Sequence, residues 1–65
     1  MNELDILKDR KKSIEQRLKD LSEKILKETD STTKVALVNN LHNGMKELND
    51  VKAQINEIIK NQNHD

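Results

Sequence analysis

Six basic residues are the candidates for contacts with an acidic partner or a phosphate: Arg10, Lys11, Lys12, Arg17, Lys24 and Lys52. Guanidinium and ammonium groups donate charge-assisted hydrogen bonds to carboxylate and phosphate oxygens. The stretch KDRKK, residues 8–12, is the densest basic group in the chain. On a helix its basic side chains point in different directions, so a solvated helix surface is the alternative interpretation.

Metal binding and catalysis find no support in the sequence. His42 and His64 are the histidines of the chain, and neither has a second His, Cys or carboxylate at the helical spacing that a metal site needs. Cysteine is absent, and no nucleophile is paired with a base or with a glycine-rich phosphate loop. We therefore expect no metal, no cofactor, no small-molecule site and no enzymatic activity.

The composition favours a single helical domain over residues 1–65. Twelve Lys and Arg residues balance twelve Asp and Glu residues, which leaves no electrostatic footprint for nucleic acid. Aromatic residues and proline are absent, as is typical of coiled coils and helical bundles. The longest apolar run, VALV, is too short to cross a membrane, and the first residues lack a signal-peptide pattern, so we expect a cytoplasmic protein. The many Lys and Asn residues are typical of proteins from phages or low-GC bacteria.

Two heptad-like runs of apolar residues predict two helices, each with a seam for packing. The predicted seam of the first half is Leu4, Leu7, Lys11, Ile14, Leu18, Leu21 and Ile25. The predicted seam of the second half is Val38, Leu41, Met45, Leu48, Lys52, Ile55 and Ile59. Asn2 suits the N-cap of the first helix, with Asp5 three residues later.

The stretch TDSTT, residues 29–33, decides between a hairpin and one continuous rod. Ile25 and Val38 lie thirteen residues apart, whereas unbroken heptads require fourteen. Ser, Thr and Asp favour turns and caps, and Asp30 or Ser31 suits the N-cap of a second helix. We predict an all-α, two-helix antiparallel hairpin. Its helices span about 3–28 and 33–60, with a turn at about 29–32 and a frayed tail at 61–65.

The two predicted seams match in an antiparallel arrangement. Ile25 then packs against Val38 at the turn, and Leu4 packs against Ile59 at the open end. The same arrangement brings Lys11 and Lys52 into one layer, where the two lysines form a common defect in the seam.

A further row on the second helix lies outside this predicted seam: Leu37, Gly44, Val51 and Ile58. We predict that this row is an interface. In it Gly44 either lets another backbone approach or leaves room for Arg17. The alternative is that Arg and Lys stems cover the row. Two hairpins joined through the row would form a homodimeric four-helix bundle. We expect the turns at opposite ends, because that arrangement keeps the lysine layers apart.

The segment LHNGMKEL, residues 41–48, resembles part of the second helix of the Rop family of plasmid copy-number proteins in its Leu-His and Glu-Leu pairs. The resemblance implies a short hairpin that dimerises into a four-helix bundle and binds paired RNA loops. The RNA-binding face of that family lies on the first helices and includes an aromatic residue, which this chain lacks. We therefore assign no functional residue of this chain from the Rop family.

These patterns favour a small non-enzymatic adaptor or inhibitor that binds another protein through a helix face. One alternative is a Rop-like regulatory protein that binds RNA or DNA through the basic residues. Another is a purely structural scaffold piece. The balanced charge favours a protein partner over nucleic acid.

Overall fold

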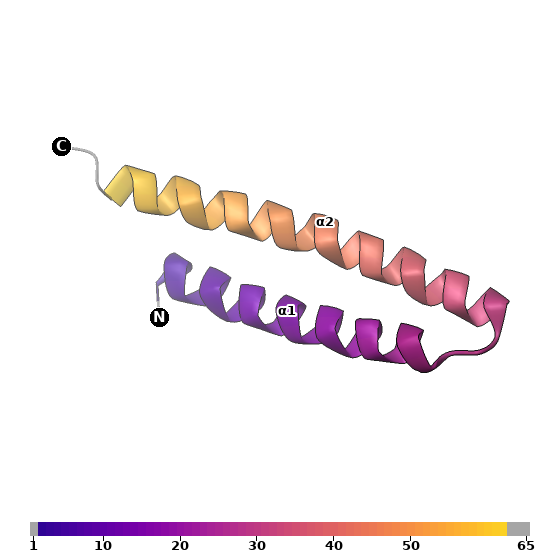
Figure 1. The fold of residues 1–65 in the computed structure, drawn as a ribbon. Helices are drawn as coiled ribbons and strands as arrows, with labels where there is room; N and C mark the ends of the chain where they lie inside the picture. The colour runs from indigo at the N-terminus through magenta and orange to yellow at the C-terminus, as the bar shows by residue number, and fades with distance from the viewer. Residues whose placement is uncertain (1, 63–65) are drawn as a thin grey trace.

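The chain folds into a hairpin of two antiparallel α-helices, as predicted. A computed structural model describes residues 2–62, in which α1 spans Glu3–Lys27 and α2 spans Ser31–Gln62. The helices lie side by side along most of their length, with the turn at one end and both chain ends at the other (Figure 1). Within residues 2–62, neither helix has a stretch long and apolar enough to span a membrane.

The start of α1 is fixed by the predicted cap. The side chain of Asn2 accepts a hydrogen bond from the Asp5 backbone N–H at 2.9 Å, which satisfies one of the free donors of the first turn. Glu3 and Asp5 lie in this first turn, whereas Lys24 and Lys27 lie in the last. This charge distribution complements the helix dipole at both ends.

The turn is shorter than predicted and occupies residues 28–30. The carboxylate of Glu28 accepts hydrogen bonds from the backbone N–H groups of Thr29 (3.1 Å) and Asp30 (3.0 Å). Asp30 then caps α2, because its carboxylate accepts from the backbone N–H (2.9 Å) and hydroxyl (2.8 Å) of Thr33. The backbone bond and then the hydroxyl bond lower the pKa of Asp30.

The second helix runs slightly further than the sequence predicted. It ends at Gln62 rather than near residue 60, so Asn61 and Gln62 are helical. The remainder of the predicted tail, residues 63–65 with His64, lies outside the described residues.

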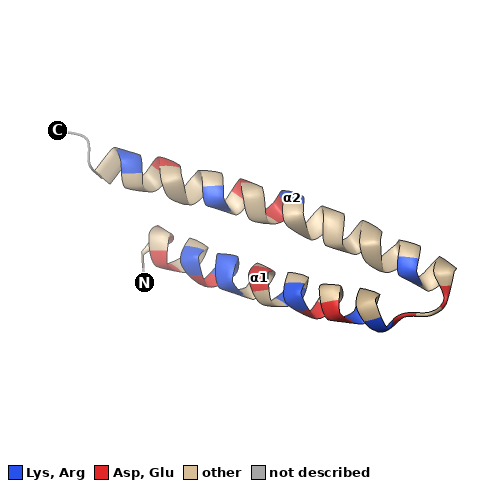
Figure 2. Ribbon diagram, viewed as in Figure 1, with Lys and Arg blue, Asp and Glu red and all other residues tan. Residues whose placement is uncertain are grey.

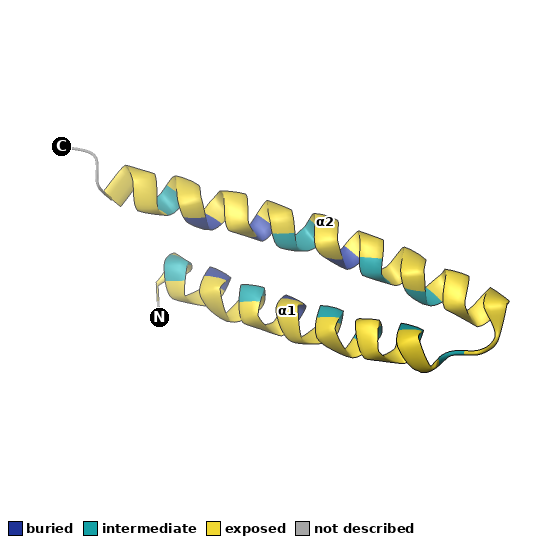
Figure 3. Ribbon diagram, viewed as in Figure 1, coloured by how far each residue is buried: buried dark blue, intermediate teal, exposed yellow. Residues whose placement is uncertain are grey.

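The core is a narrow strip between the two helices. Leu7, Ile14, Val51 and Ile55 are its buried side chains. Leu4, Leu18, Leu48 and Ile58 pack against them as partly buried neighbours. Buried positions lie where the helices face each other, and most of the remaining surface is exposed (Figure 3). A strip this thin buries little apolar area for a chain of 65 residues.

The predicted seam of α1 is confirmed. In α2 the predicted seam residues Leu41, Leu48 and Ile55 are confirmed, but the other four predicted positions are wrong by one residue. Val51 has no exposed surface and Gly44 is buried. Val38 and Met45, which were predicted to pack in the seam, are about half exposed. The true seam of α2 is Leu37, Leu41, Gly44, Leu48, Val51, Ile55 and Ile58, which has the same alternating spacing of four and three residues.

The contact between Gly44 and Leu18 explains this phase. A Cβ atom on Gly44 would lie 2.5 Å from Leu18 Cδ2, so the leucine methyl occupies the space that a larger residue would fill. An antiparallel pair in this register sets Val51 level with Lys11. The predicted layer of Lys11 and Lys52 is therefore wrong: Lys52 is exposed, and Lys11 alone is partly buried. Burying Lys52 in the seam would have desolvated an ammonium group without a partner.

Candidate protein-interaction surface

One edge of the hairpin exposes a row of apolar side chains on α2, which we call the apolar edge: Val35, Val38, Met45 and Ile59. Their exposed fractions are 60, 46, 51 and 39% in that order. Val38, Met45 and Ile59 each follow a seam residue directly, and Val35 lies one turn before Val38. The row shares its face of α2 with His42, Asn49, Lys52 and Asn56. This exposed row differs from the predicted interface row, and three of its members, Val38, Met45 and Ile59, were predicted to pack in the seam.

The half of the apolar edge near the turn carries no formal charge. Residues 35–45 contain no Asp, Glu, Lys or Arg, and this stretch of α2 is uniformly tan in Figure 2. On α1, Leu26 is 84% exposed, and antiparallel register places it at the level of Val35. The turn end thus exposes Val35, Val38 and Met45 on the uncharged segment of α2, and Leu26 on α1.

The other half of the apolar edge forms an open pocket of about 540 Å³, lined by both helices. Its lining residues are Lys8, Asp9, Lys11, Lys12, Glu15, Ile55, Asn56 and Ile59. Lys52 lies one helical turn from Asn56 on the same face of α2. This end therefore combines an aliphatic floor with a rim on which lysines outnumber carboxylates.

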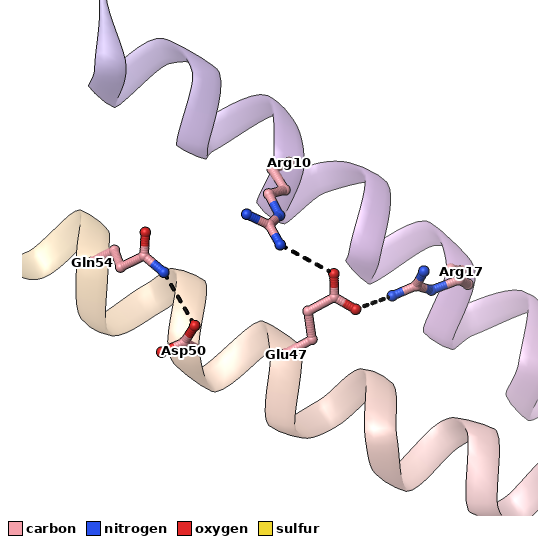
Figure 4. A network of polar contacts seen from close by, with 5 residues as sticks. All are labelled: Arg10, Arg17, Glu47, Asp50 and Gln54. Atoms are coloured by element: carbon pink, nitrogen blue, oxygen red, sulfur yellow. Dashed lines mark hydrogen bonds and ion pairs between the residues drawn. The ribbon is translucent and has the colours of Figure 1, made fainter.

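The opposite edge of the hairpin is polar and internally paired. The carboxylate of Glu47 contacts Arg17 Nη2 at 2.5 Å and Arg10 Nη2 at 3.5 Å, which ties α2 to α1 (Figure 4). The hydrogen bond from Arg17 is the main cause of the lowered pKa of Glu47. One turn further on, Gln54 donates to Asp50 at 3.1 Å. The half-exposed guanidinium groups thus already have a carboxylate partner.

The six basic residues predicted as ligand contacts do not form one surface. Arg10 and Arg17 lie on the paired edge, and Lys24 lies nearer the turn beside Leu37 in a second small pocket. The other three, Lys11, Lys12 and Lys52, belong to the apolar edge. A phosphate backbone would therefore meet two separate basic groups, of which one is already neutralised in part by Glu47.

The predicted interface row has almost no free surface. Gly44 and Val51 are buried inside the hairpin, and Leu37 and Ile58 are partly buried beside them. The prediction that these four residues lie outside the hairpin seam is wrong. Their spacing was the available signal, because Leu37, Gly44, Val51 and Ile58 alternate with the shared seam residues without including a charge.

Sequence reasoning missed the exposed residues Lys8, Leu26 and Val35 as parts of a surface. The uncharged run from residue 35 to residue 45 was a signal for the turn end. Among residues 2–62, no group of three or more His, Cys, Asp or Glu side chains is placed to hold a metal ion. Comparisons of the chain with protein-family models, curated proteins and solved structures gave no match.

Proposed function

We propose that this chain is a small, non-enzymatic adaptor or inhibitor that binds another protein in the cytoplasm through the apolar edge. The observation that carries the proposal is the uncharged stretch 35–45, which exposes Val35, Val38 and Met45 on one face of α2. Contiguous exposed apolar residues rimmed by polar ones are typical of interaction sites. Within residues 2–62, six large hydrophobic side chains are exposed, and four of them, Val35, Val38, Met45 and Ile59, form this edge.

The spacing of these residues suits recognition of another helix. Val38 and Met45 lie two turns apart on the same face, with Val35 one turn before Val38. A partner helix that places apolar residues at the same period would bury all three and convert the hairpin into a three-helix bundle. Met45 adds an adaptable side chain, which suits a surface that accommodates a partner.

A second copy of the chain fits this edge less well than a foreign helix. A two-fold pair with both turns at one end would set Lys8, Lys12 and Lys52 against the same residues of the copy. A pair with opposed turns separates these lysines but places them against the uncharged stretch around Val38, where they lose water without gaining a carboxylate. Opposed turns remain the less repulsive of the two arrangements.

Site-specific photo-crosslinking tests the proposal. A photoreactive amino acid replaces Val38 or Met45 in the full chain, and matched variants carry it at Asn39 or Lys46. Each control residue follows its test residue directly and points about 100° away on the same helix. The variant chains are exposed to a low-GC bacterial lysate, and the adducts are identified by mass spectrometry.

The adaptor function predicts one foreign adduct from positions 38 and 45 and none from positions 39 and 46. An adduct that contains only a second copy would assign the apolar edge to assembly and overturn the adaptor function. Equal labelling from all four positions, or none from positions 38 and 45, would also overturn it.

A further inference from the structure

We infer that the partner segment is an acidic amphipathic helix, lying along the apolar edge with its carboxylates over Lys8, Lys12 and Lys52. The inference rests on the proposed function and adds the chemistry of the partner. It follows from the different character of the two ends of this edge. At the turn end the α2 segment 35–45 is uncharged and exposes apolar side chains, whereas the open end has an aliphatic floor with a basic rim.

The lysines of the open end are available for a partner. In the part of the chain that the structure describes, the ion pairs join Arg10 and Arg17 to Glu47, and none involves a lysine. Lys8, Lys12 and Lys52 are exposed. Three lysines line the pocket, Lys8, Lys11 and Lys12, against the two carboxylates of Asp9 and Glu15, and Lys52 lies one helical turn from the lining residue Asn56. An incoming carboxylate would therefore meet a rim of net positive charge.

The floor of the same pocket requires an apolar side chain between those carboxylates. Ile59 is 39% exposed, and Ile55 lines the pocket from below while packing in the core. Aliphatic side chains of a partner would displace water from the exposed surface of Ile59, whereas a purely anionic ligand would leave that surface exposed to solvent. A helix with an apolar stripe flanked by Asp or Glu supplies both groups at once.

The length of the edge fits one helix. From Val35 to Ile59 the rise along α2 is about 36 Å, which a partner helix of about 24 residues would cover. Such a helix would contact the uncharged turn end with its apolar stripe alone. Its flanking carboxylates would be needed only over the lysines.

A nucleic acid fits the same pocket poorly. Asp9 and Glu15 stand among its lysines and would repel phosphates. The chain has no aromatic residue on which a base could stack. The exposed apolar residues of the floor would also remain uncovered by a phosphate backbone.

Two synthetic helical peptides of about 24 residues test the inference. Both carry Leu at heptad a and d positions, and their flanking positions are all Glu in one peptide and all Gln in the other. Binding to the full chain is measured by fluorescence anisotropy at low and at high salt. The chain is tested as wild type, as Lys8→Glu/Lys12→Glu and as Lys46→Glu, a single charge reversal on the back of α2, with circular dichroism as the check of folding.

The inference predicts that the Glu peptide binds about tenfold more tightly than the Gln peptide at low salt, as a few exposed ion pairs allow. Salt should shrink the preference, Lys8→Glu/Lys12→Glu should abolish it, and Lys46→Glu should leave it unchanged. Equal affinities for the two peptides, no binding of either peptide, an equal effect of Lys46→Glu, or tighter binding of an RNA duplex would overturn the inference.

The Val38→Asp variant separates this inference from the proposed function. Val38 lies on the uncharged end, so its substitution should weaken both peptides. The new carboxylate also repels the flanking Glu side chains, so the preference for Glu should shrink but remain. If both peptides bind Val38→Asp as they bind the wild type, the apolar edge is not the binding surface and the proposed function fails. If Val38→Asp weakens both but the peptides never differ, the proposed function stands and the acidic partner is wrong.

Discussion

Replacing Gly44 with alanine isolates the contact that sets the phase of α2. Alanine is favoured over glycine inside a helix by about 1 kcal/mol. The new Cβ atom would lie 2.5 Å from Leu18 Cδ2 and 3.7 Å from Leu18 Cγ, so the leucine has to move. Overpacking of this kind costs about 1–3 kcal/mol. We therefore expect Gly44→Ala to leave the free energy of unfolding unchanged or to lower it by up to about 2 kcal/mol.

The same substitution should have the opposite effect once the leucine is shortened. Leu18→Val has no Cδ atoms, so the atom that would lie 2.5 Å from the new Cβ is absent. A valine methyl at the position of the leucine Cγ would be in ordinary van der Waals contact, so only the gain in helix propensity remains. In that background we expect Gly44→Ala to raise the free energy of unfolding by about 1 kcal/mol. The coupling energy between the two positions is then about 1–3 kcal/mol.

Urea unfolding followed by far-ultraviolet circular dichroism measures all four chains of the cycle, because the chain has no aromatic chromophore. Asn39→Ala is the control, since this exposed position changes helix propensity without touching the seam. It should have the same small effect in both backgrounds. If Gly44→Ala stabilises the native chain as much as the Leu18→Val chain, then Leu18 does not occupy the space above Gly44 and the explanation of the register is refuted.

Three further predictions concern the core, the cap and the paired edge. Val51→Ala should lower the free energy of unfolding by about 2 kcal/mol, because it removes two fully buried methyl groups. The control Val38→Ala, at an exposed position, should change the free energy of unfolding by less than about 0.5 kcal/mol, and urea unfolding measures both variants. Asp30→Ala should lower the melting temperature, whereas Asp30→Asn should keep the cap. Because the pKa of Asp30 is lowered in the folded chain, the stabilisation from its ionised carboxylate is complete above pH 3.8 and is lost as the pH falls further. Thermal melts in acid should therefore depend less on pH for Asp30→Asn than for the native chain. Glu47→Gln should lower the melting temperature at neutral pH and should make the melting temperature depend less on pH below pH 4.5, as thermal melts would show. The exposed control Glu57→Gln should have neither effect.

The hairpin could be predicted from the sequence because several local signals agree. The apolar period of the first half identified the seam of α1, and Asn2 and Asp30 identified the two helix starts. The turn proved shorter than expected because the Glu28 carboxylate accepts the first N–H groups after α1, a role that composition does not reveal.

The seam of α2 could not be predicted by counting apolar residues. Two adjacent rows share Leu41, Leu48 and Ile55. One row adds Val38, Met45 and Ile59 with Lys52, and the other adds Leu37, Val51 and Ile58 with Gly44, so each contains six apolar residues. The choice depends on the partner helix, because Leu18 fills the space above the glycine. The same error affected the predicted interaction surface. The sequence predicted a wide apolar face on α2, but the residues that it assigned to the surface, Leu37, Gly44, Val51 and Ile58, are those that pack against α1.

The three-residue turn also bears on whether two copies could exchange helices. If residues 28–30 straightened into one rod, Leu37 would follow Ile25 by twelve residues, which rotates it by about 120° around the helix. The stripes of α1 and α2 would then face different directions, and one exchanged partner could not bury both. Domain swapping through the turn would therefore expose part of the core, so the spacing of the seams itself protects the closed hairpin.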